Sequence, residues 1–290
     1  MKFSIVIPTY NNFNYLKLCI NSIIKNSSFD HEIIIHINGI DKLSEDYIKE
    51  NNYLYTSTPK NVGLCTGVNI AAKKSTTDYI VYAHDDMYFL PNWDTYLHEE
   101  IKLLPDNLFY LSCTQLSHYP KGKGEINHVH FDAGNSLSNF DEKLLLNNYQ
   151  KIPFHNLQGS HWAPHIIHKD IWNKISGFSE EFDPGFGSDP DLNMKLWNLG
   201  VRIFKGVNKS RVYHFGSLTT RKKKNIIRNN GRKTFLLKWK LSIDFFIKFY
   251  LRRGTSYKGP LENPNKNIRY FFSLIKSKVN YFIIKLCKRN

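Results

Sequence analysis

Cysteine, proline and glycine are scarce in this chain of 290 residues, which holds 4 Cys, 11 Pro and 16 Gly. The cysteines stand far apart and form no Cys-x-x-Cys pair. This spacing excludes a zinc ribbon and a short disulfide framework, and it is typical of a reducing compartment. The low Pro and Gly content excludes a fibrous or low-complexity chain. Because 41% of the residues are hydrophobic, we expect a globular protein with a sizeable core rather than a disordered one.

Long apolar runs are also missing. No segment reaches the roughly 18 consecutive apolar residues that a membrane-spanning helix needs. The apolar part of the first residues is shorter than the core of a signal peptide, and no small-residue cleavage site follows it. We therefore expect a cytoplasmic protein that does not cross a bilayer.

Acidic residues are nearly absent from the last quarter of the chain. Residues 218–290 contain 20 Lys and Arg but only Asp244 and Glu262, a net charge of +18. Residues 1–217 contain 20 Lys and Arg against 23 Asp and Glu, a net charge of −3. We expect a near-neutral body (1–217) followed by a basic helical extension (218–290). Such a charge suits an anionic membrane surface, nucleic acid or an acidic partner, or it serves solubility alone.

Two segments of the basic extension have the apolar periodicity of amphipathic helices. One runs from Phe235 to Arg253 and the other from Ile268 to Arg289, and both carry aromatic residues on the apolar side. Basic helices of this kind are typical of proteins that lie on an anionic membrane. The alternative is that each apolar stripe packs on the body. We favour the membrane surface and no nucleic acid, because no nucleic-acid-binding module is recognisable.

Apolar runs and helical patterns alternate along the body. Strands are expected at Lys2–Ile7, Glu32–Ile37, Tyr53–Ser57 and Asp78–Ala83. With helices between them, these strands predict an α/β, Rossmann-like fold with a mostly parallel central sheet. Ligands of such sheets bind beyond the carboxyl ends of the strands. Asn11, Asn38 and the pair Asp85–Asp86 stand there.

Two acidic clusters are candidates for chemistry. Asp85 and Asp86 repel each other at a strand end unless a cation lies beside them, and Mg²⁺ or Mn²⁺ bridging to a diphosphate is the usual one. A solvated loop pair is the alternative. Asp189 stands where a loop enters a predicted helix, and Asp191 lies in its first turn. Both favour the helix dipole, or Asp189 is a general base aimed into the same cleft.

Five short motifs occur along the body in this order: Ser4–Asn11 (SIVIPTYN), Asn61–Asn69 (NVGLCTGVN), His84–Asp86 (HDD), Gly177–Phe182 (GFSEEF) and Gly187–Leu192 (GSDPDL). In this order they resemble the family 2 glycosyltransferases, which have the GT-A fold and use nucleotide-activated sugars. The resemblance covers about residues 1–217 and implies a GT-A fold for the body.

The resemblance also implies roles for single residues. Those expected to bind the nucleotide sugar are Pro8, Thr9, Asn11, Asn38, Asn61, Gly67, Asn69 and Asp85. Asp86 and His214 would bind Mn²⁺ or Mg²⁺, and Asp189 would be the general base. Taken alone, His214 reads as an ordinary surface or core histidine. The acceptor-binding candidates are His161, Trp162 and Asp191, since an aromatic face suits a sugar ring; a buried core position is the alternative for Trp162.

Two positions depart from the family pattern. Ile37 stands where the family often has an Asp that contacts the nucleobase, so Asn38 or a backbone group would replace that Asp. Ser188 stands where Glu is usual, which bears on the positioning of the acceptor beside Asp189.

The activity that follows is inverting, metal-dependent glycosyl transfer. The expected donor is a nucleoside-diphosphate sugar, with UDP as the first candidate, and the acceptor is a hydroxyl of a glycan or lipid-linked saccharide at the cytoplasmic face of a membrane. One alternative is a non-catalytic sugar-binding, nucleotide-binding or membrane-docking protein on a decayed transferase fold. A nucleotidyltransferase is less favoured, because no glycine-rich, Arg/Lys-bearing phosphate loop stands near the start of the body.

Overall fold

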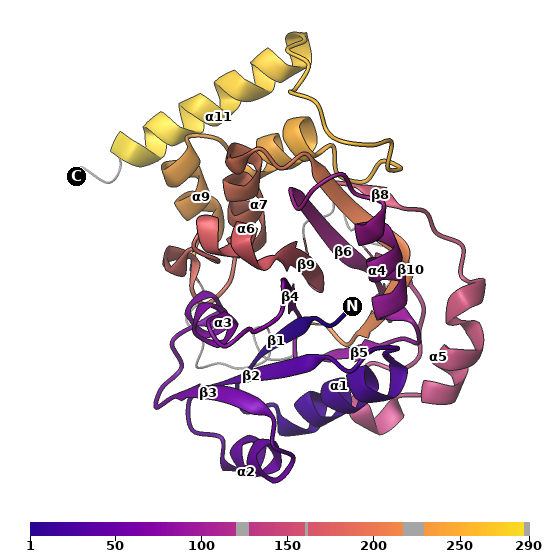
Figure 1. The fold of residues 1–290 in the computed structure, drawn as a ribbon. Helices are drawn as coiled ribbons and strands as arrows, with labels where there is room; N and C mark the ends of the chain where they lie inside the picture. Colours follow the sequence, from indigo (N-terminus) through magenta and orange to yellow (C-terminus); the bar gives the residue numbers. More distant parts are fainter. Residues whose placement is uncertain (120–127, 160–161, 217–228, 287–290) are drawn as a thin grey trace.

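The computed structural model describes residues 1–119, 128–159, 162–216 and 229–286. They form a ten-stranded sheet flanked by helices (Figure 1). The strand order is β3-β2-β1-β4-β9-β6-β10-β5, with β7 beside β6 and β8 beside β10. The strands are β1 (Ser4–Thr9), β2 (Glu32–Asn38), β3 (Leu54–Thr58), β4 (Tyr79–Tyr82), β5 (Met87–Phe89), β6 (Phe109–Ser117), β7 (His128–His130), β8 (Leu157–Gln158), β9 (His165–His168) and β10 (Ile203–His214).

Helices connect the strands and cover the sheet. In the body they are α1 (Phe13–Asn26), α2 (Lys42–Glu50), α3 (Leu64–Ala72), α4 (Trp93–Lys102), α5 (Glu142–Asn148), α6 (Lys169–Lys174) and α7 (Ser188–Leu199), with short 3₁₀ turns at Leu137–Asn139, Tyr149–Lys151 and Glu180–Phe182. In the basic extension they are α9 (Gly231–Trp239), α10 (Ile243–Phe245), the π-helical η4 (Phe246–Leu251) and α11 (Ile268–Leu286).

The first half of the sheet confirms the predicted parallel strands. β3, β2, β1 and β4 are parallel neighbours, and all four predicted strands exist with ends shifted by at most two residues. β1 was expected to end at Ile7, but it continues through Pro8. Val6 O accepts a hydrogen bond from Ala83 N at 3.0 Å, so the backbone N–H and C=O groups of the even-numbered residues of β1 point toward the β4 side. β4 has ended at Tyr82, so the missing N–H of Pro8 removes no ladder hydrogen bond.

The second half of the sheet contains both parallel and antiparallel pairs, which the apolar pattern of the sequence did not predict. β9 is antiparallel to both β4 and β6, and β5 is antiparallel to β10. The register of the last pair sets His214 opposite Met87. This pairing brings the end of β10 beside the turn that carries Asp85 and Asp86.

The first segment of the basic extension is not the single helix that was expected from Phe235 to Arg253. α9 ends at Lys240, whose φ of +56° is left-handed, and a new helix begins after Ser242. The Ser242 N–H donates to Ser277 Oγ at 2.6 Å, so a contact distant in sequence fixes the break. Phe235 and Phe246 are fully buried in the same core as the body strands. Here the apolar residues pack on the body.

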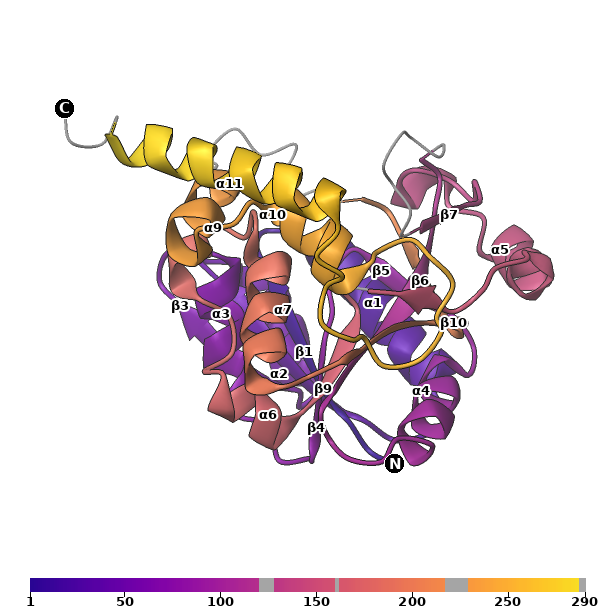
Figure 2. The ribbon, with the colours of Figure 1, turned by 90° about the horizontal axis from the view of Figure 1, so that it is seen from above.

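The last helix, α11, matches the prediction closely and crosses the outside of α9 (Figures 1 and 2). In the part of the chain that the structure describes, no helix is both long and apolar enough to span a membrane. The predicted boundary between body and extension, at 217/218, lies outside the described residues.

Candidate active site

A cavity of about 240 Å³ opens where β1 and β4 end. Its walls come from the end of β1, the turn after β4, the loop before α3 and the loop of residues 183–187 before α7, which we call the acidic loop. Seven of the predicted site residues line it: Pro8, Thr9, Asn38, Asn61, Asp85, Asp86 and Asp189. The two acidic clusters, about a hundred residues apart in sequence, therefore face one cavity.

Asp189 lies in the first turn of α7, which begins after Gly187 in a left-handed conformation (φ +87°). The side chain is half-buried and borders the cavity. Burial raises the pKa of Asp189 from 3.8 to about 7, because the charged carboxylate loses its hydration. A carboxylate with this pKa is a stronger base than an ordinary Asp, and part of it is deprotonated at neutral pH.

The paired carboxylates are buried, with Asp85 at 6% and Asp86 at 4% exposure. Thr9 Oγ1 donates to Asp85 Oδ2 at 2.8 Å, which ties the turn after β4 to the end of β1. The Asp86 carboxylate lies beside His214. The two carboxylates therefore have different partners. This arrangement excludes the solvated loop pair that the sequence left open.

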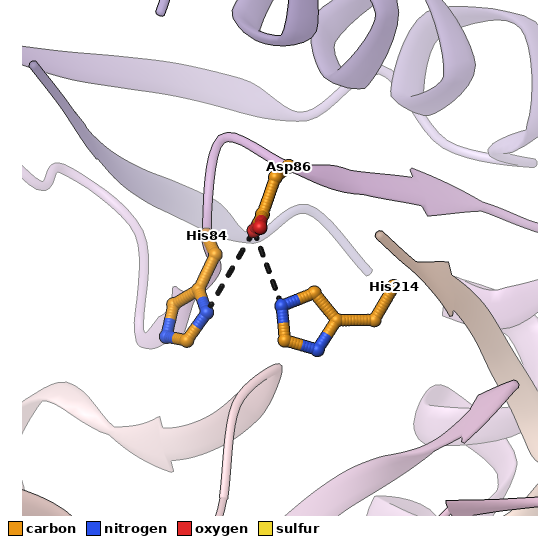
Figure 3. Close-up of side chains that lie close together, drawn as sticks. All are labelled: His84, Asp86 and His214. Atoms are coloured by element: carbon orange, nitrogen blue, oxygen red, sulfur yellow. Dashed lines mark hydrogen bonds and ion pairs between the residues drawn. The ribbon is translucent and has the colours of Figure 1, made fainter. Parts of the chain in front are cut away.

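Asp86 lies between two histidines, as Figure 3 shows. Its Oδ1 is 3.1 Å from His214 Nε2 and 4.0 Å from His84 Nδ1. One potential ligand atom from each residue lies within 4.8 Å of the others. Two imidazole nitrogens and a carboxylate oxygen form a donor set that suits a divalent transition ion with open positions for other ligands. The three residues therefore fit the expected metal.

His84 is the member of this cluster to which the sequence analysis assigned no role. Its only sequence signal is its place directly before Asp85, since the chain has twelve histidines. Burial, with a contribution from nearby His214, lowers the pKa of His84 to about 4. The neutral ring that results is the form that binds metals. On the far side of the cluster, His214 Nδ1 lies 3.2 Å from Gln115 Oε1, which orients the His214 ring.

Asp183 is a second residue that the sequence analysis did not single out. Its carboxylate accepts hydrogen bonds from Cys65 N at 2.7 Å and from Thr66 Oγ1 at 2.6 Å, so it caps the start of α3. A Cβ on Gly63 would lie 2.2 Å from Asp183 Cγ, and Gly63 has a φ of +95°. Glycine is thus required where the loop before α3 meets the acidic loop. No local pattern reveals a contact across 118 residues.

Several of the predicted nucleotide-binding residues make contacts within the protein. Asn38 lines the cavity, but its amide donates to Gly63 O at 2.9 Å and accepts from Val62 N at 2.7 Å. Gly67 lies outside the lining, where a Cβ would meet His36 at 2.7 Å. Asn69 lies outside it too, and its side chain binds both backbone groups of Phe178. The Asn38 side chain therefore joins the end of β2 to the loop before α3, and the Asn69 side chain joins α3 to the chain at Phe178.

Other predicted site residues that the structure describes do not line the cavity. Asn11, Trp162 and Asp191 are not part of its lining, and His161 lies outside the described residues. Trp162 is only 7% exposed, in agreement with the core position that was left open for it. Asp191 is fully buried and bonds to Trp239 on α9.

Comparisons with known proteins agree with this architecture. The Glycosyl transferase family 2 model matches residues 4–171. An "Uncharacterized glycosyltransferase" of Rickettsia bellii (strain RML369-C) is 28% identical over 116 residues, which is 39% of this chain but 16% of that protein. The match thus spans about a sixth of that relative's length.

Two solved structures share the fold at low identity. S. aureus TarS 1-349 in complex with UDP-GlcNAc has a TM-score of 0.58 at 16% identity, over 85% of this chain and 65% of that one. GalNAc-T7 with UDP, GalNAc and Mn²⁺ has a TM-score of 0.59 at 17% identity, over 83% of this chain and 48% of that one. These similarities confirm the GT-A fold. Because the family model matches more than half of the chain, the protein belongs to glycosyl transferase family 2.

Proposed function

We propose that the protein is an inverting, metal-dependent glycosyltransferase that moves a sugar from a nucleoside diphosphate to a hydroxyl group. One observation carries the proposal: Asp189, with its raised pKa, borders the same cavity as Asp86 of the His84–Asp86–His214 cluster. A proton acceptor and a cation site on one cavity are what this transfer needs.

Asp189 is the proposed general base. A sugar hydroxyl is a weak nucleophile, and it attacks the anomeric carbon as its proton passes to a carboxylate. The new C–O bond forms while the bond to the diphosphate breaks, so the configuration at the anomeric carbon inverts. The residue directly before Asp189 is Ser188, so position 188 supplies no second carboxylate. One base suffices for this single displacement.

His84, Asp86 and His214 are the proposed metal ligands. A divalent ion held by them would neutralise the negative charge that develops on the departing diphosphate. Two imidazoles favour Mn²⁺ over Mg²⁺, which prefers oxygen ligands. Mn²⁺ is also the ion in the GalNAc-T7 structure. We therefore propose Mn²⁺ as the first ion to test.

The proposed donor is a UDP-sugar, which is supported by the UDP and UDP-GlcNAc in the two similar structures. Pro8, Thr9 and Asn61 line the cavity and are the proposed nucleotide contacts. Asp85, held by Thr9, would contact the donor sugar or ribose.

The proposed acceptor is a hydroxyl of a glycan or of a lipid-linked saccharide. Phe186 lines the cavity three residues before Asp189 and is 37% exposed. An aromatic ring at this position offers a flat apolar face to an acceptor sugar beside the base. We propose Phe186, rather than the buried Trp162, as that platform.

A donor-hydrolysis assay tests the function. The full chain is incubated with a panel of UDP-sugars, with and without Mn²⁺, and free UDP is measured. We expect slow Mn²⁺-dependent release of UDP from one of them, and thermal stabilisation by the same sugar nucleotide. Absence of both effects across the panel would favour a non-catalytic protein. Formation of UTP and sugar 1-phosphate when pyrophosphate is added would indicate a nucleotidyltransferase.

A further inference from the structure

The last helix, α11, has one face packed on protein. Tyr270, Ser277 and Tyr281 are buried on this face, and the ring centroid of Tyr270 lies 5.0 Å from that of Phe245. Ser277 Oγ accepts the hydrogen bond from Ser242 N. These contacts fix the rotation of α11 about its own axis, so its opposite face is held outward.

The outward face of α11 is a continuous apolar stripe. Its members are between 48% and 71% exposed: Ile268, Phe271, Phe272, Ile275, Val279, Phe282, Ile283 and Leu286. At 3.6 residues per turn they fall on one side along the whole helix. They are half of the large exposed hydrophobic residues in the described part of the chain. A patch of this kind marks an interaction surface, because single exposed apolar residues are normal but a contiguous row is not.

Basic residues follow both long edges of the stripe. Arg269 and Lys276 lie about a quarter turn to one side, and Lys278 and Lys285 about a quarter turn to the other. α11 contains no Asp or Glu, and the last acid before it is Glu262. Lys and Arg stems reach along apolar surface while their charged ends stay in a polar layer.

An apolar stripe could be covered by a second copy of the protein or by a lipid bilayer, and the charges along its edges distinguish these two partners. A second copy of α11 on the same face would bring four cations of each helix together, and like charges at such an interface are unfavourable. A bilayer with anionic headgroups meets both features at once, because acyl chains accept the stripe and phosphates accept its edges. We propose that α11 lies in the interface of an anionic membrane with its axis parallel to the surface.

Docking of α11 on a membrane would also set where the active-site cavity lies relative to the membrane. This consequence rests on the proposed function. α11 packs on α9, and α9 begins at Gly231, where a Cβ would lie 1.8 Å from Phe186 O in the acidic loop. In Figure 2, α11 crosses the side of the molecule opposite the N terminus, where β1 starts. The carboxyl end of β1, at which the cavity opens, points toward that side. A docked α11 would therefore hold the cavity near the headgroups, where a lipid-linked saccharide presents its hydroxyls.

Vesicle co-sedimentation tests the docking. The full chain is mixed with phosphatidylcholine vesicles that contain or lack phosphatidylglycerol, without nucleotide or sugar. We expect binding to the anionic vesicles, and at least about tenfold weaker binding of Ile275→Glu/Phe282→Glu, which places two charges in the stripe. Ile24→Glu is the matched control, because Ile24 on α1 is 57% exposed and Ile275 is 59% exposed. Unchanged binding of the double variant would overturn the proposal.

The basic edges have their own variant. Lys276→Gln/Lys278→Gln should weaken binding to anionic vesicles about fivefold for each cation removed, and salt should weaken the wild type in the same way. Lys73→Gln/Lys74→Gln, at an exposed site beyond α3, should bind as the wild type does. Equal binding to vesicles without phosphatidylglycerol would overturn the role of charge. A lipid-free dimer that dissociates on Ile275→Glu/Phe282→Glu would instead show a second copy on this face. Since no donor is present, none of these outcomes depends on the proposed activity.

Discussion

The indole of Trp239 donates a 2.8 Å hydrogen bond to the carboxylate of Asp191, two residues beyond Asp189 on α7. Lys238 reaches the same carboxylate at 2.9 Å and Glu181 at 2.7 Å. α9, which belongs to the basic extension, is therefore fastened to the helix that carries the proposed base. Part of the extension acts as a clamp on the site rather than as a free tail.

Trp239→Phe should loosen this clamp while keeping an aromatic ring in place. It leaves the buried Asp191 with one donor fewer, which costs about 1–3 kcal/mol of unfolding free energy. We expect a lower melting temperature and a lower kcat, with little change in donor affinity. Arg232→Met, at an exposed position of the same helix, is the control. A variant with wild-type stability and kcat would show that the hydrogen bond does not position α7.

Asp189→Asn should lower the rate of transfer by about 10²–10⁴-fold, because an amide does not accept the hydroxyl proton. Donor binding, measured by calorimetry with Mn²⁺, should persist. In the wild type kcat/KM should rise with pH up to about 7, since the base must be deprotonated and the pKa of Asp189 is about 7. A near-normal rate for the variant would remove Asp189 from the mechanism.

The raised pKa of Asp189 also predicts that the free energy of unfolding falls as the pH rises, whereas kcat/KM rises with pH. The folded protein holds the Asp189 proton up to about pH 7, whereas the unfolded chain releases it near the ordinary value of 3.8. The contribution of Asp189 to stability is thus lost as pH rises between these values, by up to about 4 kcal/mol. Asp189→Asn should unfold at higher denaturant concentration than the wild type at pH 8, with a smaller difference at pH 4. An equal difference at both values would contradict the raised pKa.

Metal binding should depend on all three residues of the cluster. Asp86→Ala should abolish Mn²⁺-dependent binding of UDP, because it removes the only carboxylate of the set. His84→Ala should weaken it by at least about tenfold. His155→Ala, an exposed histidine outside the cluster, serves as the control. If Mg²⁺ supported wild-type binding better than Mn²⁺, or if His84→Ala left it unchanged, His84 would not be a ligand.

Gly63→Ala should disrupt the junction between the acidic loop and α3. The added methyl group meets Asp183 at 2.2 Å and must also adopt a φ of +95°. Gly200→Ala is the matched control, because Gly200 has a φ of +106° and no atom within 4 Å of an added Cβ. The control should lose about 1–2 kcal/mol from backbone strain alone. Gly63→Ala should lose more stability and also donor affinity; equal losses would show that the steric contact is relaxed at little cost.

The sequence alone predicts the first four strands of the sheet, the last helix and the place of the candidate site. The apolar runs predict β1 to β4, because side chains buried on both faces of a parallel strand must be apolar along its length. Helical periodicity predicts α11, and the polar residues after the strands predict where the site lies. The resemblance of the ordered motifs to the family implies the roles of Asp86 and Asp189. These features depend on neighbours within a few residues, so a linear pattern contains them.

Other features depend on contacts that only the tertiary structure sets. The antiparallel pairing of β5 with β10 brings His214 to Asp86, and the cap on α3 comes from Asp183, 118 residues away. The break at Lys240 is fixed by Ser277 on α11. Burial, which raises the pKa of Asp189, also arises only when the walls of the cavity assemble. Residue types and periodicity decide which elements form, but the packing of elements distant in the chain decides which side chains meet and how much water reaches them.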